Sequence, residues 1–188
     1  MSKIKKLPYN HEDGFCLIEI RLNKIQQLFS SLDPAPFRER DLDPAAESYI
    51  VHAVKDFPHK LPMKIVLFMP EAELTTTDTT IISNAVRNFF VYRKTVILED
   101  LKTLLHGGWI SFVIALVFLM SCLMLRQMVE KLFSGTMAVV ANEGLLIMGW
   151  VAMWRPIYIF LYEWWPFIGR IRIYNKLKDI AVEFRPLR

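Results

Sequence analysis

The feature that most constrains this chain is a long stretch without charge. From Thr103 to Leu125 the sequence carries no Lys, Arg, Asp or Glu, and from Trp109 onward it is apolar except for two serines and a cysteine. At about 1.5 Å per helical residue, such a segment crosses a hydrocarbon core of roughly 30 Å. Trp109 and Arg126 suit the two membrane surfaces, where aromatic and basic residues gather. The sequence therefore predicts a transmembrane span over about 107–126. The alternative, a buried helix of a soluble core, would leave a 188-residue chain with little to cover it.

A second hydrophobic stretch, residues 132–169, is too long for one straight span and too short for two. We expect a helix over about 135–154, joined to the first span by a short turn, so that the two form an antiparallel hairpin over 107–154. Arg155 would then mark the membrane surface, and Pro156 and Pro166 suit breaks at the two ends of an aromatic interfacial segment. The predicted interfacial aromatics are Trp109, Trp154, Tyr158, Tyr162, Trp164 and Trp165.

Charge is distributed unevenly along the chain. In residues 1–106 the basic and acidic side chains cancel, whereas residues 155–188 carry seven basic and three acidic groups and hold the whole excess of +4. A basic tail beside an apolar, aromatic segment is typical of the anionic cytoplasmic face of a membrane. No base-stacking or groove-reading motif accompanies it, which argues against a nucleic-acid partner.

Orientation follows from the same charges. Basic residues precede the first span and follow the second, while the connecting turn has only Arg126 and Lys131. The first residues, 1–6, are basic but are not followed by the apolar core of a signal peptide. We therefore expect both termini in the cytoplasm.

Residues 1–106 predict a small cytoplasmic β-α-α-β-α domain. The alternation in 16–22 and the apolar run 63–69 indicate strands. Asn23 begins a short helix bearing Ile25, Leu28, Phe29 and Leu32. Asp43 and Pro44 are typical of a helix start, an N-cap followed by the favoured first-turn proline, and the cluster 75–80 offers caps for a long helix that no proline interrupts. Two strands make a thin sheet, so a third strand or a second copy should complete it.

The tail offers that third strand. Ile180, Val182 and Phe184 alternate with polar or small residues, which predicts a strand returning to the sheet beside 16–22 or 63–69; a frayed, solvated tail is the alternative. The preceding residues, 171–177, form a basic amphipathic stretch suited to a membrane surface. Gly107 and Gly108 would serve as a flexible joint at the first span.

Glu143 is the candidate functional residue of the hairpin. With the second span at 135–154 it lies inside the membrane, where an ionisable group suggests an ion path or an intersubunit contact. If the span starts later, Glu143 sits at the outer interface instead. The neighbouring Asn142 can hydrogen-bond across helices in either case.

Arg155 and Glu163 are also candidates, but eight residues of straight helix separate them by about 80° and roughly 12 Å. Direct pairing is therefore not expected, and Arg155 should reach the lipid headgroups. Elsewhere, the histidines at 11, 52 and 59 stand in no triad or metal-ligand spacing, and the sequence lacks a glycine-rich phosphate loop. We expect no catalytic residue, cofactor or metal.

The segment Glu143-Gly-Leu-Leu-Ile-Met-Gly-Trp-Val-Ala-Met-Trp-Arg-Pro156, continued by Leu161-Tyr-Glu-Trp-Trp-Pro166, resembles uncharacterised bacterial two-span integral membrane proteins. Arg40-Asp-Leu-Asp-Pro44 fits the same pattern. The resemblance implies a bacterial inner membrane and no particular activity. The function predicted from the sequence is a non-enzymatic membrane protein that assembles with copies of itself or as an accessory subunit of a larger membrane complex. The alternative is an oligomeric ion channel or membrane-permeabilising effector with Glu143 in its path.

Overall fold

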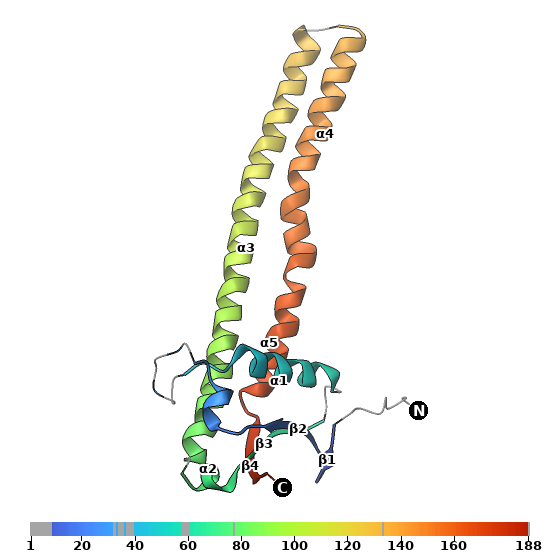
Figure 1. Cartoon of the computed structure of the whole chain (residues 1–188). Helices are drawn as coiled ribbons and strands as arrows, with labels where there is room; N and C mark the ends of the chain where they lie inside the picture. Colours follow the sequence, from blue (N-terminus) through green and yellow to red (C-terminus); the bar gives the residue numbers. More distant parts are fainter. Residues whose placement is uncertain are drawn as a thin grey trace, which may run out of the picture. The chain divides into compact units, whose positions relative to one another are not determined.

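The structure is a computed structural model that describes residues 9–31, 33, 36, 40–57, 61–76, 78–132 and 134–187. It is a mixed α+β protein with long helices, as the sequence predicts, and its small sheet has four strands, of which the short β1 is not predicted (Figure 1). In chain order the elements are β1 (His11–Glu12), β2 (Phe15–Arg21), the 3₁₀-helix η1 (Ile25–Leu28), α1 (Pro44–Asp56), β3 (Met63–Met69), α2 (Glu71–Thr76), α3 (Thr79–Leu132), α4 (Thr136–Tyr158), the π-helix η2 (Ile159–Glu163), α5 (Trp165–Leu177) and β4 (Ala181–Pro186).

The chain divides into two compact units. Unit 1 comprises residues 1–95 and 170–188, and unit 2 comprises residues 96–169. Helix α3 begins in unit 1 and ends in unit 2, whereas α5 begins in unit 2 and ends in unit 1. Unit 2 is thus an insertion into the chain that forms unit 1.

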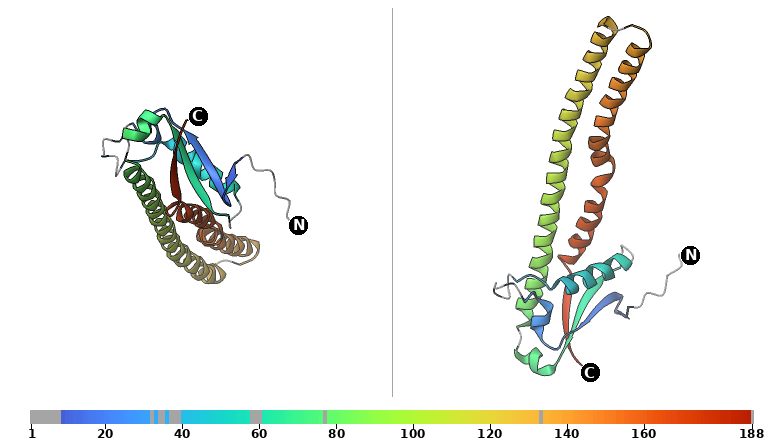
Figure 2. Two further views of the ribbon diagram at one scale, coloured as in Figure 1. Left: turned by 90° about the horizontal axis from the view of Figure 1, so that it is seen from below. Right: turned by 45° about the horizontal axis from the view of Figure 1, so that its top comes forward.

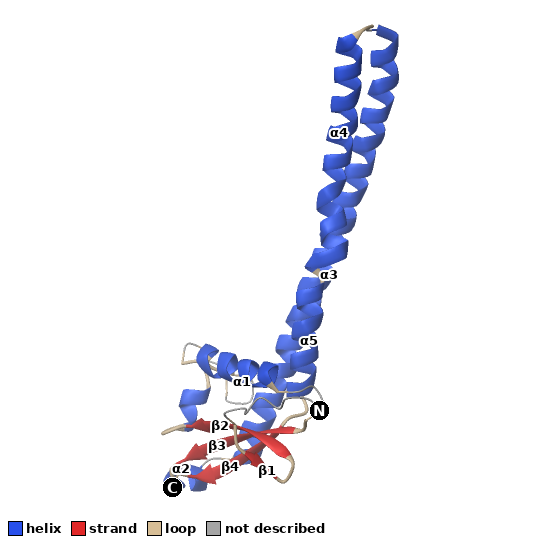
Figure 3. Ribbon diagram, turned by 90° about the vertical axis from the view of Figure 1, so that its right-hand side faces the viewer, coloured by secondary structure: helices blue, strands red, loops and turns tan. Residues whose placement is uncertain are grey.

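The sheet of unit 1 has the order β1-β2-β3-β4. The short β1 pairs antiparallel with β2, while β3 runs parallel to both of its neighbours, β2 and β4 (Figure 3). Ile65 lies opposite Ile18 on one side and Val182 on the other. The predicted C-terminal strand is therefore confirmed, beside residues 63–69. Parallel strands need a crossover connection, and unit 2 lies within the crossover from β3 to β4.

Two helix starts follow the predicted capping chemistry. Asp43 Oδ1 accepts a 2.8 Å hydrogen bond from the Ala45 amide, and Pro44 is the first residue of α1. Asp78 Oδ1 accepts bonds of 2.9 and 3.2 Å from the amides of Thr80 and Ile81 at the start of α3. Each carboxylate satisfies amides that have no partner within the helix. Helix α3 then continues for 54 residues without interruption.

The core of unit 1 forms between the sheet and its helices. Buried side chains come from the strands, from α1 and from the first turns of α3, in the positions that the sequence periodicity indicates. They include Ile18, Ile50, Ala53, Val54, Ile65, Leu67, Ile82, Ala85, Val86 and Phe90.

The prediction of a helix after Asn23 is wrong in both the type and the length of the element. Only the 3₁₀ turn η1 forms, and Phe29 is already extended, with φ −112° and ψ 153°. One turn is enough to bury Ile25 and Leu28, and the extended Phe29 pairs in a β-bridge with Leu42. Leu32 lies outside the described residues. Tertiary pairing here outweighs the helical spacing of the apolar residues.

The stretch 171–177, predicted to lie on a membrane surface, belongs to the end of α5 in unit 1. Its apolar side chains Tyr174 and Leu177 are buried, and the ring of Tyr174 lies 6.1 Å from that of Phe90. The protein itself therefore covers part of the amphipathic face, while Ile171 and Ile173 are half-buried, and a place at a membrane surface stays a prediction.

Candidate functional site

Unit 2 exposes apolar surface along nearly its whole length. Two helical stretches, Thr79–Leu132 and Thr136–Leu177, are long and apolar enough to cross a membrane, and only 17% of the most apolar window of each is buried. The exposed apolar side chains include Ile114, Val117, Met124, Val140, Ile147 and Trp154. A soluble protein rarely leaves so continuous an apolar surface open to water.

Helices α3 and α4 lie side by side and antiparallel (Figures 1 and 2). A Cβ atom on Gly149 would lie 2.7 Å from Leu119 Cδ1 and 3.5 Å from the Cβ of Cys122. The absence of a side chain at Gly149 thus lets the two backbones approach closely, as small residues do between membrane helices.

Two further contacts fix the same register. Near one end of the pair, Asn142 Nδ2 donates a 3.2 Å hydrogen bond to Glu130. Near the other end, a Cβ on Gly108 would lie 2.9 Å from Ile159 Cγ2. By this register, residues 107–126 of α3 face roughly residues 144–163 of α4 and η2.

These contacts also bear on the predicted joint at Gly107 and Gly108. Both residues lie inside the continuous helix α3. Gly108 has a packing role, because it admits Ile159, whereas the space around a Cβ on Gly107 is open. Flexibility at these glycines stays a prediction.

Arg155 and Glu163 form an ion pair, contrary to the prediction. Arg155 Nη1 donates to Glu163 Oε1 at 2.5 Å. The straight-helix geometry assumed for the sequence does not apply, because η2 lies between the two residues. A π-helix bonds residue i to i+5 and so turns less per residue than an α-helix. The π-helix therefore reduces the angle between the two side chains, and their lengths span the rise between them.

The helix also continues past Pro156, so the predicted break there is wrong. Proline removes one backbone donor from the helix, and the irregularity follows three residues later, as η2. There the Ile159 amide bonds to both Arg155 O and Pro156 O, and the indole nitrogen of Trp164 donates a 2.8 Å bond to Phe160 O. The side chain of Trp164 thus adds a hydrogen bond to the backbone of η2.

The predicted interfacial aromatics fall into three groups. Trp109 packs edge-on against Phe160 of η2, at 5.7 Å between ring centroids, and Trp164 and Trp165 contact each other at 5.6 Å. Trp154, Tyr158 and Tyr162 recur every four residues along α4 and η2, so they share one face, and the rings of the two tyrosines are 5.5 Å apart.

Polar residues gather at the opposite end of the helix pair. Glu143 is exposed on α4, and no described residue pairs with it. Asn142 Oδ1 and Arg126 Nε are buried atoms with no hydrogen-bond partner in the described part of the chain. By the register above, Glu143, Asn142 and Arg126 lie at a similar level along the pair.

Unit 1 contains a polar cluster that the sequence does not predict. Arg93 of α3 forms two hydrogen bonds with Glu47 of α1, at 2.9 and 3.0 Å, and the hydroxyl of Tyr174 in α5 donates to the same carboxylate at 2.5 Å. Burial and the adjacent Glu47 raise the pKa of Tyr174 to about 12. The cluster ties three helices of unit 1 together.

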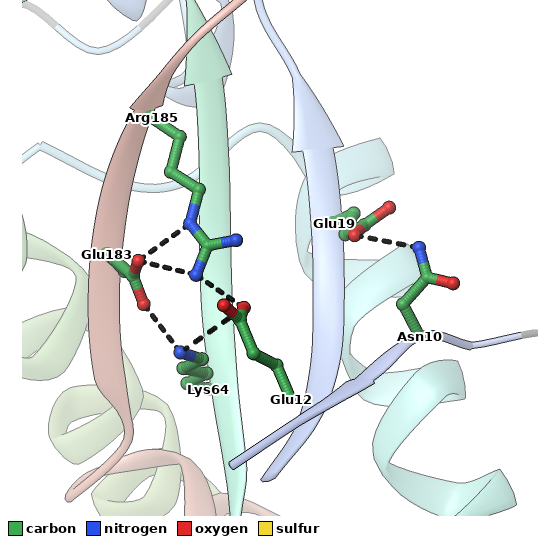
Figure 4. Close-up of polar contacts among 6 residues, drawn as sticks. All are labelled: Asn10, Glu12, Glu19, Lys64, Glu183 and Arg185. Carbon is green, nitrogen blue, oxygen red and sulfur yellow. Dashed lines mark hydrogen bonds and ion pairs between the residues drawn. The ribbon is translucent and has the colours of Figure 1, made fainter.

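A second such cluster covers one face of the sheet (Figure 4). Lys64 lies 2.7 Å from Glu183 and 3.8 Å from Glu12, and Arg185 lies 2.6 Å from each of the same two carboxylates. Hydrogen bonds from Arg185 and Lys64 lower the pKa of Glu183. The helical ribbons lie behind the strands in this view, so the four balanced charges occupy the face that the helices leave open.

A thiol and an imidazole also lie close together in unit 1, outside both clusters, at Cys16 and His11. The Cys16 thiol, 3.3 Å from His11 Nδ1, is fully buried, and burial raises its pKa, which disfavours the reactive thiolate. Among the described residues, no group of three His, Cys, Asp or Glu side chains could hold a metal ion. His59 lies outside those residues.

The chain matches no protein-family model, and neither curated proteins nor solved structures gave a match.

Proposed function

We propose that this chain is a non-enzymatic integral membrane protein with two spans, which carries a small α+β domain and assembles with copies of itself or with other membrane subunits. The observation that carries the proposal is the apolar outer surface of unit 2. Trp109, Ile114 and Val117 are each more than half exposed, and burying such surface among lipid acyl chains is strongly favourable.

The register of the helix pair indicates which residues the hydrocarbon would cover. The first span, 107–126, is bounded by polar residues, and its level on the partner helix is roughly 144–163. Twenty residues at about 1.5 Å each match a core of roughly 30 Å. The register thus favours a second span at 144–163 over the span at 135–154 predicted from the sequence.

This assignment changes the environment of the charged residues. Glu143, Arg126 and Glu130 would meet one membrane surface, and His106 and Glu163 the other. Arg155 would be the one basic residue within the hydrocarbon section of the second span. Its ion pair with Glu163 then makes physical sense, because an unpaired charge at that depth is costly.

The proposed orientation has the sheet domain and both ends of the chain in the cytoplasm of a bacterium, with the turn near Ser134 outside its inner membrane. The basic residues that flank the two spans support this orientation, and the resemblance of residues 143–166 to bacterial two-span proteins supports the location. The partners are therefore the lipid bilayer and other protein subunits, with no nucleic acid.

Assembly is proposed because an exposed carboxylate of the hairpin, Glu143, has no partner in the part of the chain that the structure describes. Among the described residues, Glu143 is exposed on α4 and has no ion-pair or hydrogen-bond partner. A neighbouring subunit can supply the missing hydrogen bonds.

The mass of the native assembly in detergent tests this proposal against the 22.0 kDa of one chain. We expect a multiple of that mass or a larger complex, and Glu143→Gln should weaken the assembly, whereas Glu73→Gln in unit 1 should not. A monomer at all protein concentrations, with no co-purifying subunit, would contradict it.

The alternative is a channel lined by Glu143. It requires that carboxylate in the hydrocarbon section, and the register favours the membrane surface instead. Ion flux through the purified protein in liposomes distinguishes the two, because only a channel would conduct and lose its flux in Glu143→Gln.

A further inference from the structure

An open groove lies on the outer surface of α4 and η2. It has a volume of about 560 Å³ and is lined by Val151, Trp154, Arg155, Ile157, Tyr158 and Tyr162. Most of its lining is hydrocarbon and aromatic, with one guanidinium among the rings. This composition suits a ligand that has both an apolar part and a charged part.

The polar atoms of the groove are predominantly hydrogen-bond donors. In the described part of the chain, the Trp154 indole nitrogen and the hydroxyls of Tyr158 and Tyr162 have no hydrogen-bond partner, and these side chains are at least half exposed. Arg155 uses one nitrogen for Glu163, and its side chain is 65% exposed. A guanidinium with spare donors, close to hydroxyl and indole groups, fits the oxygens of a phosphate.

A carboxylate completes the arrangement at one side. Glu163 uses Oε1 for Arg155, and Oε2 is not used by any described residue. Glu163 and the two tyrosine rings together suit an ammonium group, which carboxylates bind by charge and aromatic faces attract. The Arg155–Glu163 pair carries no net charge, which matches a ligand with one charge of each sign.

We propose that this groove binds the headgroup of a zwitterionic phospholipid, with the phosphate on Arg155 and the primary ammonium on Glu163. The proposal rests on the proposed membrane insertion. In that arrangement Arg155 lies deeper than Glu163, and in a phosphatidylethanolamine the phosphate likewise lies deeper than the ammonium. The acyl chains follow the apolar surface around Val151. The lipid covers the exposed guanidinium, and the hydrocarbon section then contains no uncompensated charge.

Lipid binding to the full-length protein in an uncharged detergent tests the proposal, with bound lipid counted by native mass spectrometry. The probes are phosphatidylethanolamine, phosphatidylglycerol and diacylglycerol with the same acyl chains. We expect the first to bind severalfold more tightly than the second, and the third not to be retained. Inorganic phosphate at millimolar concentration should not displace the lipid, because it lacks the apolar part.

Substitutions of Arg155 and of Glu163 test the contributions of the two charges separately. Arg155→Gln should weaken phosphatidylethanolamine binding at least tenfold, and Arg126→Gln, at the opposite end of the hairpin, should leave it unchanged. Glu163→Gln should abolish or reverse the preference over phosphatidylglycerol, because Arg155 then has no carboxylate. The double variant Tyr158→Phe, Tyr162→Phe keeps the rings and should weaken binding severalfold even if Arg155→Gln fails to fold.

Equal binding of the three lipids, a preference for phosphatidylglycerol in the unmodified protein, displacement by inorganic phosphate, or equal losses in Arg155→Gln and Arg126→Gln would each overturn the headgroup site. Loss of the site alone leaves membrane insertion intact, because a protein without it still fractionates with membranes after alkaline extraction. If the unmodified protein is extracted by alkali, the proposed function itself fails.

Discussion

Gly149 on α4 faces Cys122 on α3, so that a Cβ atom on the glycine would lie 3.5 Å from the Cβ of the cysteine. This distance is within the range that disulfides adopt. A cross-link between these two positions would therefore test the register of the two helices directly. The register in turn sets the position of each charged residue along the helix pair.

Gly149→Cys should form a disulfide with Cys122 on mild oxidation, after a small rotation of Leu119. The cross-linked chain should migrate faster than the reduced chain in denaturing electrophoresis. Gly144→Cys is the matched control, because Gly144 has nothing within 4 Å of its Cβ position. Oxidation of both variants to the same extent, or of neither, would mean that the register is wrong.

The Arg155–Glu163 ion pair should contribute to the stability of unit 2. Each of Arg155→Gln and Glu163→Gln removes one charge and leaves the other unpaired, so each should lower the thermal stability. The double variant should lose less than the sum, with a coupling of about 1 kcal/mol. The coupling should grow when the protein is moved from detergent micelles into lipid nanodiscs, because an ion pair contributes least to stability where it is exposed to water. Additive losses would show that the two side chains do not interact.

The raised pKa of Tyr174 predicts that the stability of the folded protein depends on pH in the alkaline range. The pKa of Tyr174 is raised to about 12 in the folded protein, against an ordinary value of about 10. The stabilisation linked to this proton is therefore complete below about pH 10 and is lost as the pH rises toward 12. Tyr174→Phe should lower stability by about 1 kcal/mol at neutral pH. The tyrosinate absorbance of the unmodified protein minus that of Tyr174→Phe should titrate near pH 12; a midpoint near 10 would contradict the contact with Glu47.

Lys64 is the central cation of the sheet cluster, with only 13% of its side chain exposed. Lys64→Met keeps the apolar stem and removes both ion pairs, and should cost about 1 kcal/mol at neutral pH. Because the pKa of Glu183 is lowered, its stabilising contribution is present above its ordinary pKa and is lost as the pH falls through the lowered value. The stability difference between the two proteins in urea unfolding should therefore shrink in acid. A difference that does not change with pH would point to packing rather than charge. Lys55→Met, on the exposed side of α1, is the control.

Local patterns in the sequence predict the elements of unit 1 well. The Asp43-Pro44 pair predicts the start of α1, and the alternation of Ile180, Val182 and Phe184 predicts β4, because capping and strand periodicity are properties of neighbouring residues. Local sequence patterns do not predict helix α2. Its threonines have low helix propensity, and those at 75 and 76 instead donate their hydroxyl protons to the Ala72 carbonyl.

The contacts that define the sites are not local. Tyr174 and Glu47 are 127 positions apart, and no spacing in the sequence links them. The ion pair of Arg155 with Glu163 is close in sequence, yet it depends on a π-helix that a regular 3.6-residue period cannot reveal. The position of Glu143 along the helix pair depends on which residues of α3 face α4. The packing of Gly108 and Gly149 sets that register.

The most direct test of the two-span arrangement is cysteine accessibility in intact bacteria. In a chain with Cys16 and Cys122 replaced by serine, single cysteines at Ser134, Asn10 and Leu187 would be treated with a membrane-impermeant maleimide. The arrangement predicts that Ser134→Cys reacts in intact cells, whereas Asn10→Cys and Leu187→Cys react only after lysis. Reaction of all three from the same side would contradict a hairpin that crosses the membrane.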